Sequence, residues 1–404
     1  MLENLRKTNW SQLEIASGPA DAVPNMIEDL MDEDPDVIQE ALIALSTNIW
    51  EHGIVFDATI AAIPFLIELL DEDATDDPAG ILDLLAQIAE SRDLEEVMLP
   101  PAHEYQFMPE EGEAYVKDEQ EMEWSRDAYE AVGKGLPVYR QLLNDTDPLV
   151  RTSAAALLEQ FPIGAKDSAA ALRAAIDQED DIPTMTDMMM SLRDLLTGAV
   201  MLDEDRATYQ NFFASIFQDE TDPALRLGAA ITIAQLNADA LTQDMVDVIT
   251  DAVRDPLAYS EHVEDTLENP VHEALPILLQ LAPEKRTEAV LKAMRDTQDV
   301  ANARSLAVAA LVEVFGEEPL QGRTALRQMQ PGGVSIIYTA PPDVEDNVPL
   351  RTSLTDQQRL TVETILNNDA FWLVTSNLLT IFGLPEARRD LLEYLDDPAA
   401  YTSH

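Results

Sequence analysis

An acidic turn that precedes a helix-like apolar segment recurs along the chain, and this repeat constrains the fold more than any other feature. The turns lie at Asp34, Asp77, Asp147, Asp222 and Asp255, where proline follows the aspartate, and at Asp181 and Asp299, where it does not. With one vacancy near residue 112, their spacing averages about 38 residues, which is typical of the helix pairs of an α-solenoid. We therefore predict an all-α chain of about eight to nine helix pairs in a right-handed superhelical stack.

Length and composition agree with a repeated architecture. At 404 residues the chain exceeds the size at which one compact core stops growing. Cysteine is absent, which excludes disulfides and thiolate metal sites. The first residues lack the apolar core of a signal peptide, and no apolar run reaches the roughly 18 residues of a membrane span. We therefore expect a cytoplasmic protein that does not cross a membrane.

The chain is strongly acidic, with 25 basic and 77 acidic residues and a formal net charge of −52. Such a surface repels phosphate backbones, so we expect no nucleic-acid partner. One explanation of the acidity is a salt-rich cytoplasm, where self-repulsion is screened and lysine is rare. The other is an acidic groove for a basic partner, or mimicry of a nucleic acid. The acids spread over every repeat rather than clustering, which favours the first explanation.

Each acidic turn is predicted to cap the helix that follows it. An aspartate there offers its carboxylate to the free backbone N–H groups of the first turn and complements the positive end of the helix. Arg151, Arg226 and Arg304 follow three of the turns at a distance of about one helical turn. We predict that these arginines reach acidic groups of the neighbouring repeat and form a ladder along the stack.

Two segments interrupt the repeat of acidic turns and helices, and they divide the chain into five parts. We predict N-terminal repeats in residues 1–100, an acidic insertion in 101–127, central repeats in 128–327, an irregular insertion in 328–353 and C-terminal capping helices in 354–404. Insertions in repeat proteins map to one face and often carry the binding function. The other interpretation of both insertions is a tolerated surface loop.

A run near the N-terminus carries the most specific motif of the chain. Residues Asn48 to Thr59 read Asn-Ile-Trp-Glu-His-Gly-Ile-Val-Phe-Asp-Ala-Thr, and Pro-Phe-Leu follows at 64–66. The run resembles the pattern N-I-W-x-x-G-x-V-x-x-A-T, with a later P-F-L, of a family of bacterial HEAT-repeat proteins. Leu354 to Gln358, Trp372 and Gly383 to Pro385 are similar to the C-terminal pattern of that family. The resemblance implies HEAT-type helix pairs, and it implies no activity because the family is largely without an assigned one.

Five side chains are candidates for contact with a partner: Trp50, His52, Phe56, Tyr105 and Trp124. The first two are predicted at the end of a helix with Phe56 across the following loop, and the last two lie in the acidic insertion. Aromatic side chains at such positions anchor partners, although they also lock a helix to its neighbour. His52 stands one position later than the histidine of the family pattern, a rotation of about 100° around a helix. We therefore transfer no catalytic role to it.

The sequence predicts no catalytic, metal-binding or cofactor-binding residue. None of the five histidines belongs to a close ligand pair, and neither a nucleophile motif nor a phosphate-binding loop is present. We expect a non-enzymatic scaffold that binds another protein, and the charge favours a basic partner, as for an inhibitor or immunity-type protein. The alternative is a HEAT-type enzyme or chaperone similar to a bilin lyase, which rests on fold analogy alone.

Overall fold

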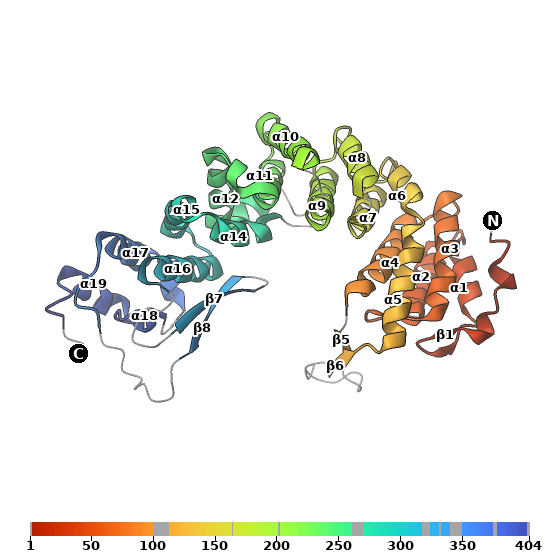
Figure 1. Ribbon diagram of the computed structural model, residues 1–404, viewed down its shortest axis with the longest axis horizontal. Helices are drawn as coiled ribbons and strands as arrows, with labels where there is room; N and C mark the ends of the chain where they lie inside the picture. Colours follow the sequence, from red (N-terminus) through yellow and green to blue (C-terminus); the bar gives the residue numbers. More distant parts are fainter. Residues whose placement is uncertain are drawn as a thin grey trace. The chain divides into compact units, whose positions relative to one another are not determined.

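The computed structural model describes residues 2–94, 96–99, 113–163, 165–200, 203–260, 270–316, 324–330, 333–339, 350–374 and 378–401. Within these ranges the chain is mostly helical, with nineteen α-helices and four two-stranded hairpins, in agreement with the predicted all-α class. The chain divides into two compact units, an N-terminal unit of Met1–Met201 and a C-terminal unit of Leu202–His404 (Figure 1).

The N-terminal unit contains nine of the described helices and three short hairpins. The α-helices are α1 (Val23–Asp29), α2 (Pro35–Ile49), α3 (Asp57–Asp71), α4 (Pro78–Glu90), α5 (Glu119–Gly133), α6 (Leu136–Leu142), α7 (Pro148–Glu159), α8 (Ala165–Ile176) and α9 (Ile182–Gly198). Short 3₁₀ turns η1 (Leu5–Lys7), η2 (Trp10–Gln12) and η3 (Ser91–Asp93) accompany them. The hairpins are β1–β2 (Glu14–Ile15 and Gly18–Pro19), β3–β4 (Trp50–Glu51 and Ile54–Val55) and β5–β6 (Glu96–Leu99 and Glu113–Val116).

Helices of the N-terminal unit form two contacting series. α2, α4, α7 and α9 contact one another in that order, and so do α1, α3, α6 and α8. Each helix of the second series also packs against the helix of the first series that follows it, while α5 is an addition that contacts α3 and α4. The approach of α2 and α4 is close, since a Cβ at Gly80 would lie 2.5 Å from Leu42 Cδ1. Fully buried leucines such as Leu45, Leu66, Leu85 and Leu157 fill the interior.

The predicted capping role of the acidic turns is confirmed at all seven positions. Each aspartate accepts a hydrogen bond of 2.7–3.2 Å from a backbone N–H of the first helical turn; the residues are Asp34, Asp77, Asp147, Asp181, Asp222, Asp255 and Asp299. In five of the turns, the side chain two residues earlier accepts the N–H of the aspartate itself, at 2.8–3.3 Å; these residues are Asp32, Thr75, Asp145, Glu179 and Thr297. Short-range hydrogen bonds thus explain why acidic and hydroxyl residues recur there.

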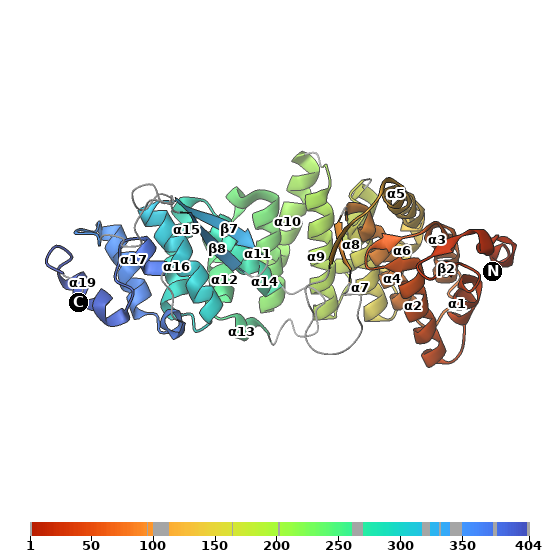
Figure 2. The same cartoon turned by 90° about the horizontal axis from the view of Figure 1, so that it is seen from below.

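The C-terminal unit contains the remaining helices and the longest hairpin of the described residues. Its α-helices are α10 (Asp203–Asp219), α11 (Pro223–Asn237), α12 (Gln243–Arg254), α13 (Pro256–Ser260), α14 (Pro270–Gln280), α15 (Pro283–Asp296), α16 (Val300–Phe315), α17 (Asp356–Asn367), α18 (Leu378–Ile381) and α19 (Arg388–Asp396), with 3₁₀ turns η4 (Ala238–Ala240) and η5 (Ala370–Leu373). α11 packs on α10, α12 and α14, and α12 contacts α14 and α15. α15, α16 and α17 all contact one another and lie side by side (Figures 1 and 2).

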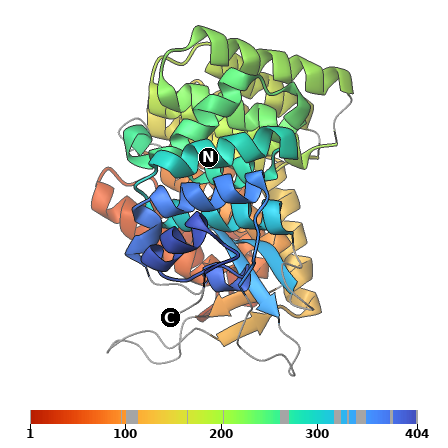
Figure 3. The same cartoon turned by 90° about the vertical axis from the view of Figure 1, so that its left-hand side faces the viewer.

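A β-hairpin occupies part of the segment that was expected to be irregular. β7 (Thr324–Gln330) and β8 (Gly333–Thr339) pair antiparallel from Thr324↔Thr339 to Gln330↔Gly333. The expectation of an irregular insertion over 328–353 is therefore wrong for the part of it that forms these strands, and β-branched and aromatic residues of the run Val334–Tyr338 account for it. β8 contacts α14 and α16, and the hairpin appears as blue arrows in Figure 3.

Helix α17 begins at a capping box. Thr355 Oγ1 accepts the N–H of Gln358 at 3.2 Å, and Gln358 Oε1 accepts the N–H of Thr355 at 3.0 Å, which is a capping box at the start of α17. Across the described ranges, no helix has both the length and the apolar character that crossing a bilayer requires.

Candidate functional site

The Asn48–Thr59 run closes on itself through a tight hairpin. α2 ends at Ile49 rather than at Trp50, and β3 pairs with β4 across a turn at His52 and Gly53. These two residues have φ of 51° and 92°, so the turn explains the glycine. Thr59 Oγ1 accepts the N–H of Phe56 at 2.8 Å and donates to the carbonyl of Ile49. The most specific motif of the sequence thus has a structural explanation.

The predicted partner-binding residues lie in different environments. Trp50 is half-buried and its Nε1 donates to Ser91 Oγ at 2.7 Å, so the indole ties the hairpin to the end of α4. His52 is exposed at the turn, and Phe56 is half-buried at the start of α3. Trp124 is half-buried on α5, a helix that contacts β4. Tyr105 lies outside the described residues. The structure therefore gives Trp50 the locking role, and whether any of the five binds a partner stays a prediction.

Lys117 joins Ser91, just after α4, to α5 and was not indicated by any sequence motif. Its side chain is 4% exposed, and its Nζ donates to the Ser91 carbonyl at 2.8 Å and to Ser125 Oγ at 3.2 Å. Burial lowers the pKa of Lys117 from 10.5 to about 8, against a smaller opposite effect of the charge on Glu121. From the sequence, an isolated lysine in an acidic segment is expected at the surface. Only the tertiary structure therefore reveals the hydrogen bonds of Lys117 to Ser91 and Ser125.

Replacing Lys117 by methionine is expected to change how stability depends on pH. Between pH 8 and 10.5 the unfolded chain keeps the lysine proton that the folded chain has lost, so the unfolding free energy of the wild type rises with pH. The K117M variant lacks this rise, which we expect to be about 3 kcal/mol. Urea denaturation at a series of pH values measures it. Exposed Lys134 provides the control, because K134M retains the wild-type profile; parallel profiles for K117M and wild type would contradict the assignment.

Acidic and apolar side chains meet at one edge of the N-terminal unit, where α7 and α9 begin. Arg151 forms a bidentate ion pair with Glu179, at 2.7 Å and 2.9 Å, which holds the two turns together. Leu149, the second residue of α7, is 52% exposed, and Ile182, the first residue of α9, is 40% exposed. Asp147, Asp180 and Asp181 lie within two residues of them in the sequence and have exposed side chains. We call these two apolar and three acidic residues the α7/α9 edge.

The predicted arginine ladder is confirmed at one position only. Arg151 reaches an acid of the next turn, as expected. Arg226 instead donates to the carbonyl oxygens of Phe217 and Glu220, at 2.6 Å and 3.4 Å. The prediction is wrong for Arg226, whose guanidinium satisfies carbonyls at the end of α10 that have no partner within the helix.

A groove of about 370 Å³ lies between α15 and α17 in the C-terminal unit. Its walls are formed by Pro283, Glu284, Thr287, Glu288, Leu291, Arg295, Gln357 and Leu360, and we call it the α15–α17 groove. Four of its residues on α15 have the spacing i, i+4, i+7 and i+11, which places them on one face of the helix; they are Glu284, Glu288, Leu291 and Arg295. That spacing is visible in the sequence, but it does not show that α17 leaves the face uncovered.

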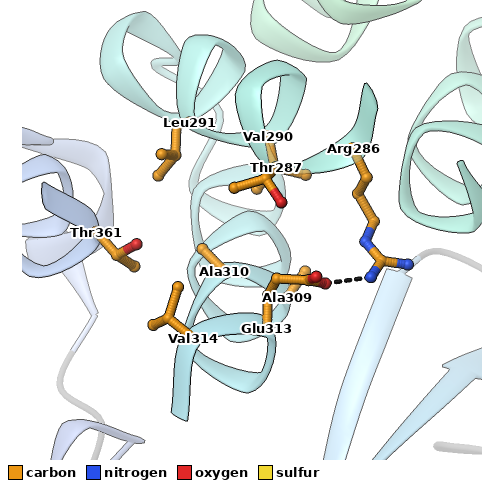
Figure 4. A pocket seen from close by; sticks show the side chains of 9 residues that line it. All are labelled: Arg286, Thr287, Val290, Leu291, Ala309, Ala310, Glu313, Val314 and Thr361. Carbon is orange, nitrogen blue, oxygen red and sulfur yellow. Dashed lines mark hydrogen bonds and ion pairs between the residues drawn. The ribbon is translucent and has the colours of Figure 1, made fainter. Parts of the chain in front are cut away.

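A small hollow adjoins this groove and shares Thr287 and Leu291 with it (Figure 4). Its volume is about 10 Å³, which suits at most one water molecule. The ion pair between Arg286 and Glu313 lies on one wall, and Thr361 lies on the other. Thr361 is 1% exposed, and its hydroxyl has no hydrogen-bond partner among the described residues. The hollow is therefore too small for a substrate but holds an unsatisfied polar atom.

In the part that the structure describes, no group of three or more histidine, aspartate or glutamate residues is arranged to hold a metal ion. No model of a known protein family matches the chain, and none of the curated proteins matches it. The resemblance of the Asn48–Thr59 run to bacterial HEAT-repeat proteins stays a prediction.

Proposed function

We propose that the helices form HEAT-type pairs stacked as a right-handed α-solenoid of about eight to nine repeats. In the N-terminal unit, the pairs α1/α2, α3/α4, α6/α7 and α8/α9 support this arrangement, because corresponding helices of successive pairs contact each other. In the C-terminal unit, the pairs α10/α11, α12/α14 and α15/α16 support it, followed by capping helices from α17 onward. The Asp-capped helices α2, α4, α7 and α9 then form one layer of the N-terminal stack.

On this framework we propose a non-enzymatic, cytoplasmic interaction protein that binds a basic partner protein. The observation that carries the proposal is the α7/α9 edge, where two exposed apolar side chains lie among three exposed carboxylates. Exposed apolar side chains rimmed by charge are typical of interaction surfaces. A net charge of −52 adds long-range attraction for a cationic partner. An inhibitor of a basic enzyme is a narrower form of the same function.

Removal of the three charges at the α7/α9 edge is expected to weaken binding of a cationic, amphipathic probe by about tenfold. The variant D147N/D180N/D181N keeps amide oxygens that cap helices as well as carboxylates do, so the fold is retained. The probe is a fluorescently labelled peptide of alternating leucine pairs and lysine pairs, titrated into the full-length protein and followed by anisotropy.

The matched control removes three exposed carboxylates from another turn of the same unit, as D32N/E33Q/D36N, and is expected to keep the affinity within about twofold. Binding should also weaken as salt rises, because the attraction is electrostatic. An affinity that is equal for both triple variants, or unchanged between low and high salt, would refute the proposal.

A further inference from the structure

Three charged side chains of the α15–α17 groove form no ion pair or hydrogen bond with any described residue. They are Glu284, Glu288 and Arg295, and all three are exposed. The other three cations of α15 are engaged: Lys285 donates to the Leu241 carbonyl at 3.0 Å, Lys292 pairs with Asp247 at 2.7 Å, and Arg286 pairs with Glu313. Among the four cations of α15, Arg295, which lines the groove, is therefore the one without a partner among the described residues.

The acidic and basic side chains of this set lie at opposite ends of the groove. Glu284 and Glu288 lie at the N-terminal end of α15, and Arg295 lies in its last turn. At 1.5 Å per residue, Glu284 and Arg295 are about 16 Å apart along the helix. Leu291 lies between them on α15, and Leu360 of α17 faces the same groove and is 44% exposed. The groove thus has an acidic end, an apolar middle and a basic end.

The hollow beside the groove shares two of its lining residues with the groove. The buried Thr361 hydroxyl lacks a partner and lines the hollow, next to Leu291 and Thr287 (Figure 4). Leaving a buried hydroxyl unsatisfied costs about 1–3 kcal/mol, which a water molecule or a bound polar group removes. A molecule that occupies the groove packs against the same two residues that wall the hollow.

We propose that the α15–α17 groove binds an amphipathic peptide segment of a partner protein with charges of opposite sign at its two ends. Lysine or arginine side chains of the segment lie against Glu284 and Glu288, leucine-like side chains lie on Leu291 and Leu360, and a carboxylate pairs with Arg295. The volume of about 370 Å³ falls within the usual range of ligand sites. This inference is independent of the α7/α9 edge, which lies in the other unit.

A charge-reversal experiment with two labelled peptides tests the proposal on the full-length protein at one fixed salt concentration. The bipolar peptide carries two lysines at one end, four leucines in the middle and two glutamates at the other end; the dicationic peptide has lysines in place of the glutamates. We expect R295E to weaken binding of the bipolar peptide by about tenfold and to strengthen binding of the dicationic peptide by a similar factor. Replacing exposed Leu360 by glutamine should weaken both peptides.

Arg389 provides the matched control, because it is an exposed arginine of the same unit and lies outside the groove. R389E is expected to leave the preference between the two peptides unchanged. The edge variant D147N/D180N/D181N should bind the bipolar peptide like the wild type, so a failure of the proposed basic-partner function is distinguishable from a failure of this site. Unchanged preference in R295E, or wild-type affinity in Leu360→Gln, would overturn the assignment.

Discussion

Raising the KCl concentration from 0.1 M to 2 M is expected to raise the thermal unfolding midpoint of this protein by at least about 10 °C. With 77 acidic and 25 basic residues, most carboxylates have no basic partner, and folding brings them closer together. The capping turns increase this repulsion, because Asp32, Glu33, Asp34 and Asp36 share one turn. The Debye length falls from about 10 Å at 0.1 M salt to about 3 Å at 1 M, so salt removes most of the penalty.

A charge-reduced variant separates screening from general salting-out. D32N/E33Q/D36N removes three neighbouring charges and keeps groups that accept the same hydrogen bonds, so it should unfold at a higher temperature than the wild type at 0.1 M KCl. At 2 M KCl the two midpoints should coincide, because the charges are screened in both proteins. Differential scanning calorimetry measures both effects. A midpoint independent of salt, or a constant offset between the two proteins, would contradict the repulsion argument.

This experiment also bears on the two explanations of the acidity. A chain adapted to a salt-rich cytoplasm needs salt for stability over its whole surface, whereas an acidic binding surface needs carboxylates only where the partner docks. A strong salt requirement together with selective loss of binding in the α7/α9 edge variant would show that both explanations apply. The acidic turns are compatible with both explanations. Each aspartate caps a helix, and its carboxylate also contributes to the negative surface.

Features that depend on neighbouring residues were predictable from the sequence. Every acidic turn caps a helix, because each aspartate and the N–H group that it accepts lie within three residues of one another. The capping box at Thr355 follows from the same local rule. The sequence predicts Trp50 and His52 at the end of a helix, whereas both lie in the hairpin after α2, because Gly53 suits a helix cap and a hairpin turn equally well.

Features that depend on tertiary contacts were not predictable in this way. Lys117 bonds to a carbonyl 26 residues earlier, and nothing in its own segment indicates that partner. Arg226 and Arg151 follow similar turns and both donate to nearby carbonyls, yet Arg151 also pairs with the carboxylate of Glu179. The α15–α17 groove could be predicted only if it were known which face of α15 is left uncovered by α17. Each of these outcomes depends on where a second helix lies.

One buried amide joins the two helices that form this groove. Asn368, at the end of α17, is 2% exposed. Its Nδ2 donates to the carbonyls of Met294 at 2.7 Å and Thr297 at 3.0 Å, which belong to the end of α15, and its Oδ1 accepts the N–H of Phe371 at 2.7 Å. All three bonds are to the backbone, so the side chain satisfies two carbonyls at the end of α15 and an N–H group of η5 at once.

Replacing Asn368 by aspartate is expected to lower the unfolding free energy of the C-terminal unit by about 3–5 kcal/mol. The change preserves the size and shape of the side chain, but it removes both donors and places a carboxylate oxygen against two carbonyl oxygens in a buried site. Asn367→Asp is the matched control one residue earlier, where the side chain is exposed and makes a single bond to the Glu363 carbonyl. Urea denaturation should show a loss below about 1 kcal/mol for N367D. Equal losses in the two variants would show that the Asn368 bonds do not hold α15 to α17, and the groove would then need another support.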